Sequence, residues 1–340
     1  MKLFLYLFVF SFWTISLAAH NTCVLRAAID VGAAGPKLRI AEVDRTTNKI
    51  TKILYTKQWS VFFQDHLSKN SDKKLSPEIM FEGLRAIKEA LALAKSFEIQ
   101  GVVIVGASPF RKALNADEFA KNIYLESGLP IHILDQELEA KLAFQAALAK
   151  SSSHLENLVA WDIGGGSTQF ITLGLEGEYL FEGSSEGSGP FRDLIVESIQ
   201  KRSLKEYKSP NPLSDEEVCL AKVHAELLAS NVTQVFKDKL CHSETRVVGV
   251  GSVFGRGIAS LVRGKNPFTT EDLEGVIHDL IGKTDCDLGG GDFACVEVSN
   301  AILVYGFMKE LGIQKMHIMD VNNADGAIVY NPFWTDKQRE

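Results

Sequence analysis

The segment that most constrains the fold spans residues 158–173, where two strand-like apolar runs flank a cluster of small residues. The acid that ends the first run and the small residues after it are Asp162, Gly164, Gly165, Gly166, Ser167 and Thr168. Consecutive glycines let the backbone adopt positive φ and leave bare N–H groups that a ligand can approach. Because a strand follows the glycines, the motif differs from nucleotide motifs in which a glycine loop opens a helix. We interpret the segment as an anion-binding hairpin with a functional acid; a plain tight hairpin is the alternative.

A second copy of this pattern lies about 130 residues earlier in the chain. Residues 24–32 form an apolar run that includes Asp30 and ends at Gly32, residues 33–36 form a turn, and residues 38–43 resume the apolar pattern. A repeat at this period indicates two related domains, and paired domains commonly hold a ligand in the cleft between them.

Apolar strands and amphipathic helices alternate along the rest of the chain. We predict further strands over residues 50–55, 101–106, 131–134, 246–252 and 315–320. We predict helices over residues 76–94, 117–127, 137–150, 191–201, 215–228 and 299–311. This alternation, twice over, is typical of an α/β protein with two lobes. We place the lobes at residues 24–152 and 157–330, with the boundary at residues 151–154 and a C-terminal segment that could pack back on the first lobe.

The N-terminus has the features of a secretory signal peptide. Lys2 precedes an apolar run over residues 3–13, and the small residues Ala18 and Ala19 suit a cleavage site. We therefore expect residues 1–19 to be removed from a secreted or periplasmic protein that has no membrane association after cleavage; an uncleaved anchor is the alternative. The net charge of −7 argues against nucleic acid as a partner.

Export makes disulfides plausible among the five cysteines. By proximity in the sequence, the candidate pairs are Cys286 with Cys295 and Cys219 with Cys241, which leaves Cys23 over. None of the five has the spacing of a zinc site.

Five motifs together resemble the exopolyphosphatase/guanosine pentaphosphate phosphatase (Ppx/GppA) family of the actin-like ATPase superfamily. They are AIDVG (28–32), RKALN (111–115), ELEAKL (137–142), DIGGGST (162–168) and VGVGS (248–252). The resemblance extends from about residue 24 to about residue 330. It implies two duplicated ribonuclease H-like domains that face each other across a cleft, in a short two-domain form of the family.

The resemblance also implies a chemistry: removal of a terminal phosphoryl group from a phosphoanhydride with Mg²⁺ or Mn²⁺. Glu139 matches the catalytic base, Asp162 the acid that helps to bind metal and position water, and Arg111 an arginine that binds phosphate. Asp30 would join Asp162 at the metal. The phosphate-binding set would be Gly32, Gly164, Gly165, Gly166, Ser167, Thr168, Gly249, Gly251 and Ser252. Viewed without the resemblance, Glu139 is a solvated or capping acid at a helix start and Arg111 caps a strand.

The sequence departs from the family pattern at the metal site. Hydroxyl and amide residues usual in the first loop are replaced by Ala33 and Ala34, Gln169 stands in place of an acid, and Ala107 in place of a small hydroxyl residue. Two hypotheses follow. The first is an exported hydrolase acting on inorganic polyphosphate or a related phosphoanhydride, with polyphosphate preferred over a guanosine polyphosphate. The second is a non-catalytic protein on the same scaffold that binds polyphosphate or a nucleotide. A sugar kinase or ATPase is a third, weaker reading. A homodimer is left open.

Overall fold

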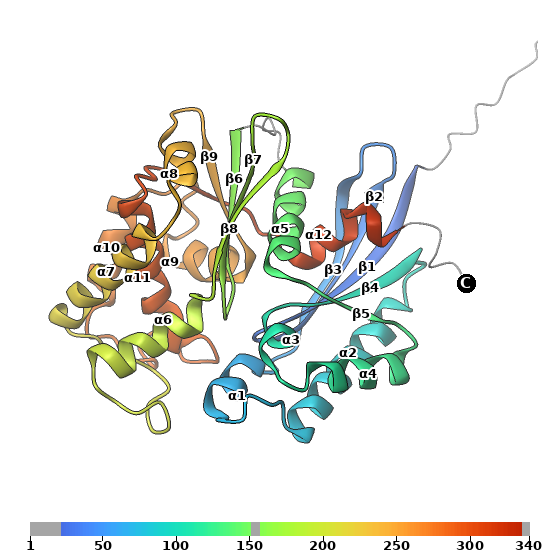
Figure 1. The fold of residues 1–340 in the computed structure, drawn as a ribbon, viewed down its shortest axis with the longest axis horizontal. Helices are drawn as coiled ribbons and strands as arrows, with labels where there is room; N and C mark the ends of the chain where they lie inside the picture. The colour runs from blue at the N-terminus through green and yellow to red at the C-terminus, as the bar shows by residue number, and fades with distance from the viewer. Residues whose placement is uncertain (1–21, 151–156, 335–340) are drawn as a thin grey trace, which may run out of the picture.

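The computed structural model describes residues 22–150 and 157–334, which form two lobes side by side (Figure 1). The predicted signal peptide and the predicted boundary at residues 151–154 lie outside the described residues. Each lobe is built around one five-stranded mixed sheet.

The two sheets have the same topology. The first runs β3-β2-β1-β4-β5 and the second β8-β7-β6-β9-β10, so that three antiparallel strands are followed by two parallel ones in both. The strands are β1 (Cys23–Gly32), β2 (Gly35–Asp44), β3 (Lys49–Gln58), β4 (Gly101–Gly106), β5 (Ile131–Ile133), β6 (Leu158–Ile163), β7 (Thr168–Leu173), β8 (Tyr179–Ser184), β9 (Arg246–Val250) and β10 (Met316–Ile318). The predicted α/β class and the predicted duplication are confirmed.

The duplication places two acids at equivalent points. Asp30 in β1 lies opposite Lys37 in β2, and Asp162 in β6 lies opposite Gln169 in β7. Each acid is near the carboxyl end of a central strand with a parallel neighbour, which is where open α/β sheets bind ligands.

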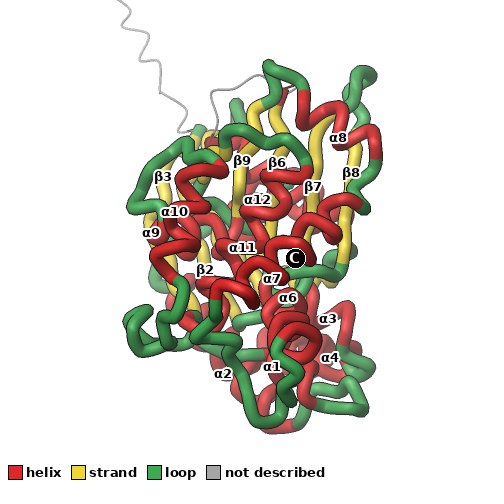
Figure 2. The backbone as a smooth tube through the Cα atoms, turned by 90° about the vertical axis from the view of Figure 1, so that its left-hand side faces the viewer, coloured by secondary structure: helices red, strands yellow, loops and turns green. Residues whose placement is uncertain are grey.

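Helices cover the outer face of each sheet. In the first lobe these are α1 (Phe63–Lys69), α2 (Pro77–Ala94), α3 (Ser108–Lys112) and α4 (Ala116–Ser127). In the second they are α6 (Ser188–Leu194), α7 (Asp215–Ser230), α8 (Gln234–Cys241), α9 (Ala259–Leu261), α10 (Thr270–Leu280) and α11 (Ala294–Glu310), with π-helical turns at Ile195–Ile199 and Val253–Ile258. Figure 2 shows α7, α10 and α11 in front of the second sheet. Trp161, fully buried, stacks with Phe170 and Phe307 in the core beneath them.

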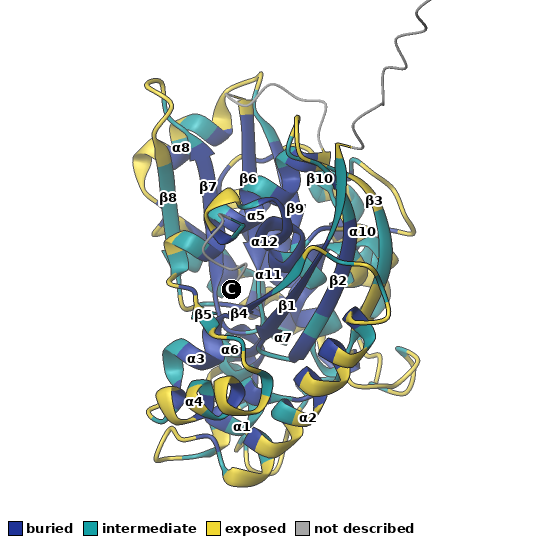
Figure 3. Cartoon of the chain, turned by 90° about the vertical axis from the view of Figure 1, so that its right-hand side faces the viewer, coloured by how far each residue is buried: buried dark blue, intermediate teal, exposed yellow. Residues whose placement is uncertain are grey.

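Two helices, α5 (Gln136–Lys150) and α12 (Asn323–Val329), lie between the two sheets (Figure 1). All seven residues of α12 and eight of the fifteen in α5 are buried, whereas α2 and α4 expose one face (Figure 3). Alanines make α5 narrow enough to pack against α12 on one side and the second sheet on the other. A Cβ on Gly326 would collide with the Leu142 carbonyl oxygen, so α12 needs glycine there. Although it follows the second lobe in the chain, α12 therefore packs on the first.

Some local predictions were wrong. The helix predicted over residues 191–201 begins earlier, at Ser188, and continues as a π-helical turn. The strand predicted over residues 315–320 is shorter, and a helix begins at Asn323 because Asn322 and Asp325 form a capping box. The short helices α1 and α3 were not predicted, since neither is long enough to show a periodic pattern.

The predicted disulfides are also absent: all five cysteines are free thiols. The sulfur of Cys241 contacts the Leu311 carbonyl oxygen at 3.8 Å, and that of Cys295 lies 4.0 Å from the Asp292 carbonyl oxygen within its own turn. Both thiols therefore face backbone instead of the partner predicted for them. Within residues 22–150 and 157–334, no helix combines the length and apolar character that a bilayer span requires.

Candidate functional site

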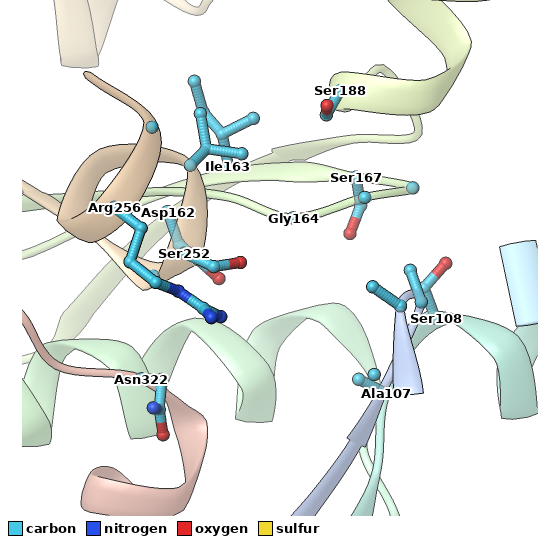
Figure 4. Close-up of a pocket in the computed structure, with 18 of the residues that line it drawn as sticks. Ala107, Ser108, Asp162, Ile163, Gly164, Ser167, Ser188, Ser252, Arg256 and Asn322 are labelled. Carbon is cyan, nitrogen blue, oxygen red and sulfur yellow. The ribbon is translucent and has the colours of Figure 1, made fainter. Parts of the chain in front are cut away.

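A cavity of about 280 Å³ lies where the two lobes meet. Its walls come from the ends of β1 and β6, the glycine hairpin, the start of α12, the turn after β9 and the first turns of α11. Figure 4 shows Asp162 and Arg256 pointing into the same space, with Ser108 of the first lobe facing Ser167 of the second. Residues from both lobes are thus needed to form the cavity.

Asp162 is held at the end of β6 with its carboxylate in the cavity. Its main-chain carbonyl accepts a hydrogen bond from the Thr168 hydroxyl at 3.1 Å, which closes the base of the hairpin. Burial, and then the nearby negative charge of Glu139, raise the pKa of Asp162 to about 8. Glycine is required at position 251 for two reasons. A Cβ there would collide with Oδ1 of Asp162, and the φ of Gly251 is +80°, which other residues rarely adopt.

Glu139, in the first turn of α5, is only 4% exposed and lines the same cavity. Arg111 forms an ion pair with its Oε2 at 2.7 Å, and Nδ2 of Asn323 donates to its Oε1 at 3.3 Å. Burial raises the pKa of Glu139, and the Arg111 charge opposes that rise. Arg111 does not itself line the cavity: besides its ion pair with Glu139, it donates to the Leu134 carbonyl at 2.8 Å and to the hydroxyl of Ser167 at 3.4 Å.

Asp30 and Lys37 form a second charged pair at the cavity, with Nζ of Lys37 4.0 Å from Oδ2 of Asp30. Burial raises the pKa of Asp30, and the Lys37 charge partly offsets this effect. Oδ1 of Asp30 is buried and has no hydrogen-bond partner among the described residues. Sequence reasoning missed Lys37, which the observed antiparallel register of β1 and β2 places opposite Asp30.

The glycine hairpin uses its carbonyls for structure and keeps two amides free. The carbonyls of Gly164 and Gly165 accept from the amides of Ser188 and Gly189 at 3.0 and 2.9 Å, which fixes the hairpin on the start of α6. The Gly166 carbonyl accepts from Nζ of Lys112 in the first lobe at 2.8 Å. Within the part of the chain that the structure describes, no acceptor meets the amides of Gly165 or Gly166. Two adjacent free amides at a cavity suit an anion.

The two lobes touch at this hairpin. A Cβ on Gly165 would lie only 2.6 Å from the Cβ of Ala33, and one on Gly166 would lie 2.6 Å from Oγ of Ser108. The ring of Phe293, which lines the cavity, also meets the ring of Phe62 from the first lobe, with the two centroids 6.2 Å apart. The glycines therefore allow the first loop of one lobe to contact the hairpin of the other.

Most predicted site residues meet at the cavity, and three do not. The lining includes Asp30, Gly32, Glu139, Asp162, Gly164, Gly165, Gly166, Ser167, Gly251 and Ser252. The buried Thr168 hydroxyl accepts a hydrogen bond from Trp161 and donates one to the main-chain carbonyl of Asp162. Gly249 leaves room for the ring of Phe254. Arg111 forms an ion pair with Glu139. Lining residues that the sequence did not indicate include Lys37, Ser108, Arg256, Phe293, Asn322 and Asn323.

Two carboxylates could hold a divalent cation here. Within residues 22–150 and 157–334, no group of three His, Cys, Asp or Glu side chains is placed to bind a metal. Mg²⁺, however, is commonly held by one or two carboxylates together with substrate phosphates and water. The unpartnered Oδ1 of Asp30 and the raised pKa of Asp162 are features that a cation would compensate. The donor set therefore fits a cation that binds with its substrate.

The duplicated sheets, with the cavity between them, define the two-domain fold of the actin-like ATPases. Solved structures show the same fold over nearly the whole chain. The Ppx/GppA enzyme of Aquifex aeolicus has a TM-score of 0.70 at 19% identity, over 90% of this chain and 99% of that one. An exopolyphosphatase of Cytophaga hutchinsonii has a TM-score of 0.69 at 17% identity, over 90% and 98%.

Sequence comparisons agree with this likeness over part of the chain. Residues 39–180 match the Ppx/GppA phosphatase family. A bifunctional 3-dehydroquinate synthase/phosphatase of Fusobacterium nucleatum is 28% identical over 45% of this chain and 24% of its own length. A putative exopolyphosphatase of Haemophilus influenzae is 28% identical over 43% of each chain. The chain thus spans less than half of the length of these curated relatives. Together the matches support a relationship to the Ppx/GppA phosphatases.

Proposed function

We propose that the protein is an exported phosphohydrolase that releases terminal phosphate from inorganic polyphosphate or a related phosphoanhydride. The observation that carries the proposal is the convergence of Glu139, Asp162 and Asp30 with the free amides of Gly165 and Gly166 on one cavity. The relationship to the Ppx/GppA phosphatases supports the reaction class. The relative from Haemophilus influenzae, a putative exopolyphosphatase, supports polyphosphate as substrate.

In this proposal the terminal phosphate lies against the glycine hairpin. The amides of Gly165 and Gly166 donate to its oxygens, and the Lys37 ammonium adds positive charge. Water attacks phosphorus, its proton passes to Glu139, and the bond to the bridging oxygen of the leaving chain breaks. Burial raises the pKa of Glu139 toward the working pH, which makes the carboxylate a stronger base. Arg111 orients that carboxylate instead of contacting phosphate.

A divalent cation, Mg²⁺ or Mn²⁺, would be held by Asp30 and Asp162 and would neutralise charge on the substrate oxygens. Since only two carboxylates face it, we expect it to enter together with the phosphate chain. Export, inferred from residues 1–19, favours inorganic polyphosphate over guanosine polyphosphates, which are made and used in the cytoplasm. A homodimer is compatible with this proposal and is not required by it.

A non-catalytic role as a phosphate-chain binder is the second candidate. It is favoured by the partners of Glu139, because Arg111 and Asn323 already occupy one oxygen each. The replacement of hydroxyl and acidic residues by Ala33, Ala34 and Gln169 points the same way.

Phosphate release from polyphosphate, with and without Mg²⁺ or Mn²⁺, distinguishes the two. We expect metal-dependent release that Glu139→Gln lowers by at least about 100-fold. The matched control is Glu137→Gln, which alters an acid of the same helical turn that pairs with Lys141 on the surface and should leave the rate unchanged. No release by the wild-type chain, with binding of the polymer retained by both variants, would favour the binder.

A further inference from the structure

The start of α12 brings two asparagines into the cavity from the far end of the chain. Asn322 and Asn323 both line it, and Asn323 is only 7% exposed. They come from the segment that crosses from the second lobe back to the first, so their position depends on how α12 is fixed.

A buried ion pair fixes this end of α12. Nε of Arg39 in β2 lies 2.8 Å from Oδ1 of Asp325, and its NH2 group donates to Oδ2 at 3.0 Å. Asp325 is fully buried, and its Oδ2 also accepts from the Asn322 amide at 2.9 Å. The second NH group of Arg39 donates to the Thr56 hydroxyl at 2.6 Å. This ion pair, with one hydrogen bond from Nη2 to Oδ2, joins the first sheet to the turn that carries Asn323.

The side-chain amide of Asn323 has one end on Glu139 and one end free. Its Nδ2 donates to Oε1 of Glu139, while its Oδ1 is buried and has no partner among the described residues. A water molecule between Oδ1 of Asn323 and the Glu139 carboxylate would find two acceptors for its two protons. Its oxygen lone pairs would then remain free to attack a phosphate bound at the glycine hairpin. A side-chain amide suits this place because it can donate or accept, whichever state Glu139 is in.

We propose that Asn323, held in place by the Arg39–Asp325 pair, positions Glu139 and the attacking water. The inference rests on the proposed hydrolytic function and extends it to three residues outside the motifs of the sequence. Arg39 lies in β2 and does not line the cavity, so it acts only through Asp325 and the start of α12.

Steady-state phosphate release by the full-length protein tests the contacts from Arg39 through Asp325 and Asn323 to Glu139. We expect Asn323→Leu to lower kcat by about 10- to 100-fold with a change in KM of less than about threefold, because positioning is lost and phosphate binding is not. Arg39→Met should lower kcat by about tenfold, and the double variant should be no slower than Asn323→Leu alone. Arg39→Lys keeps the charge without the planar fork and should fall between wild type and Arg39→Met.

The control loosens the other end of the same helix. Nδ2 of Asn48 donates to the Val329 carbonyl at 2.6 Å, and Asn48 has a φ of +52°, which glycine tolerates. Asn48→Gly should lower the melting temperature and leave kcat unchanged. A merely structural role for Arg39 would make Arg39→Lys and Asn48→Gly behave alike.

Each outcome has a distinct meaning. Wild-type release that depends on Glu139, with kcat unchanged in Asn323→Leu, would overturn this inference and leave the proposed function standing. Multiplicative effects in the double variant would also overturn it, because Arg39 would then act by another route. No wild-type release would overturn both.

Discussion

The raised pKa of Asp162 predicts an unusual dependence of stability on pH. The folded-state pKa is about 8, and an unfolded aspartate has one of about 3.9. Between these values the folded state binds more protons than the unfolded state, so the free energy of unfolding falls as pH rises from about 4 to about 8. The slope is at most about 1.4 kcal/mol per pH unit. Most carboxylates in folded proteins act in the opposite sense.

Asp162→Asn removes this ionisation while it keeps the size of the side chain. Between about pH 5.5 and about pH 8, the ionisation of Asp162 lowers the free energy of unfolding of the wild type by about 3 kcal/mol. This decrease should be absent from the variant. Asp30 and Glu139, whose pKa values are also raised by burial, keep part of the pH dependence in the variant. The variant should therefore be more stable than wild type above about pH 8, and closer to it near pH 5.5.

Urea unfolding at several pH values, without metal or phosphate, measures this difference. Tryptophan fluorescence is a suitable signal, because Trp161 is fully buried next to Asp162. Asp44→Asn is the control: Asp44 is only partly buried, and a hydrogen bond from the Thr46 amide lowers its pKa, so it does not titrate between about pH 5.5 and pH 8. Parallel curves for wild type and Asp162→Asn across this range would refute the reasoning.

Two further predictions concern glycines at the site. Gly251→Ala should destabilise the protein by about 2–4 kcal/mol, from positive φ and the collision with Asp162 together. Gly264 has a φ of +74° and nothing within 4 Å of an added Cβ, so Gly264→Ala measures the cost of positive φ alone in the same urea assay. Equal losses of unfolding free energy in the two variants would show that the contact with Asp162 does not matter. Gly165→Ala should force the hairpin away from Ala33 and lower phosphate release by about tenfold or more, measured as kcat/KM. Ala33→Gly should restore it, and failure to do so would mean that the two lobes do not meet there during turnover.

Local sequence patterns were sufficient for the fold class and for the centre of the site. A strand that carries an acid near its end and leads into a glycine-containing turn occurs twice, and such a pattern specifies a hairpin without information from the rest of the chain. The apolar runs after it indicate buried parallel strands, which place Asp30 and Asp162 at equivalent positions. Glu139 was indicated only by the family resemblance, because its local pattern alone predicts a solvated or capping acid.

Other functional positions depend on contacts between distant parts of the chain. Lys37 is found only when the register of β1 and β2 is known, and Gly249 is a packing position because Phe254 folds back over it. Arg111, which was expected to contact phosphate, does not line the cavity: it pairs with Glu139 and donates to the hydroxyl of Ser167. None of these roles can be read from residue type alone.

The sequence by itself therefore determined the α/β class, the duplicated hairpins and the acids beside them, because hydrophobic periodicity and glycine turns act over a few residues. Only the tertiary structure decided that Arg39 pairs with Asp325 at a separation of 286 residues and that Asn323 meets Glu139. It also identified α12 as the C-terminal segment that packs on the first lobe, a possibility that the sequence had left open. Residues that are polar and isolated in the sequence carry no periodic signal. Their partners are set by how the two sheets enclose α5 and α12, and by the requirement that buried charges be paired.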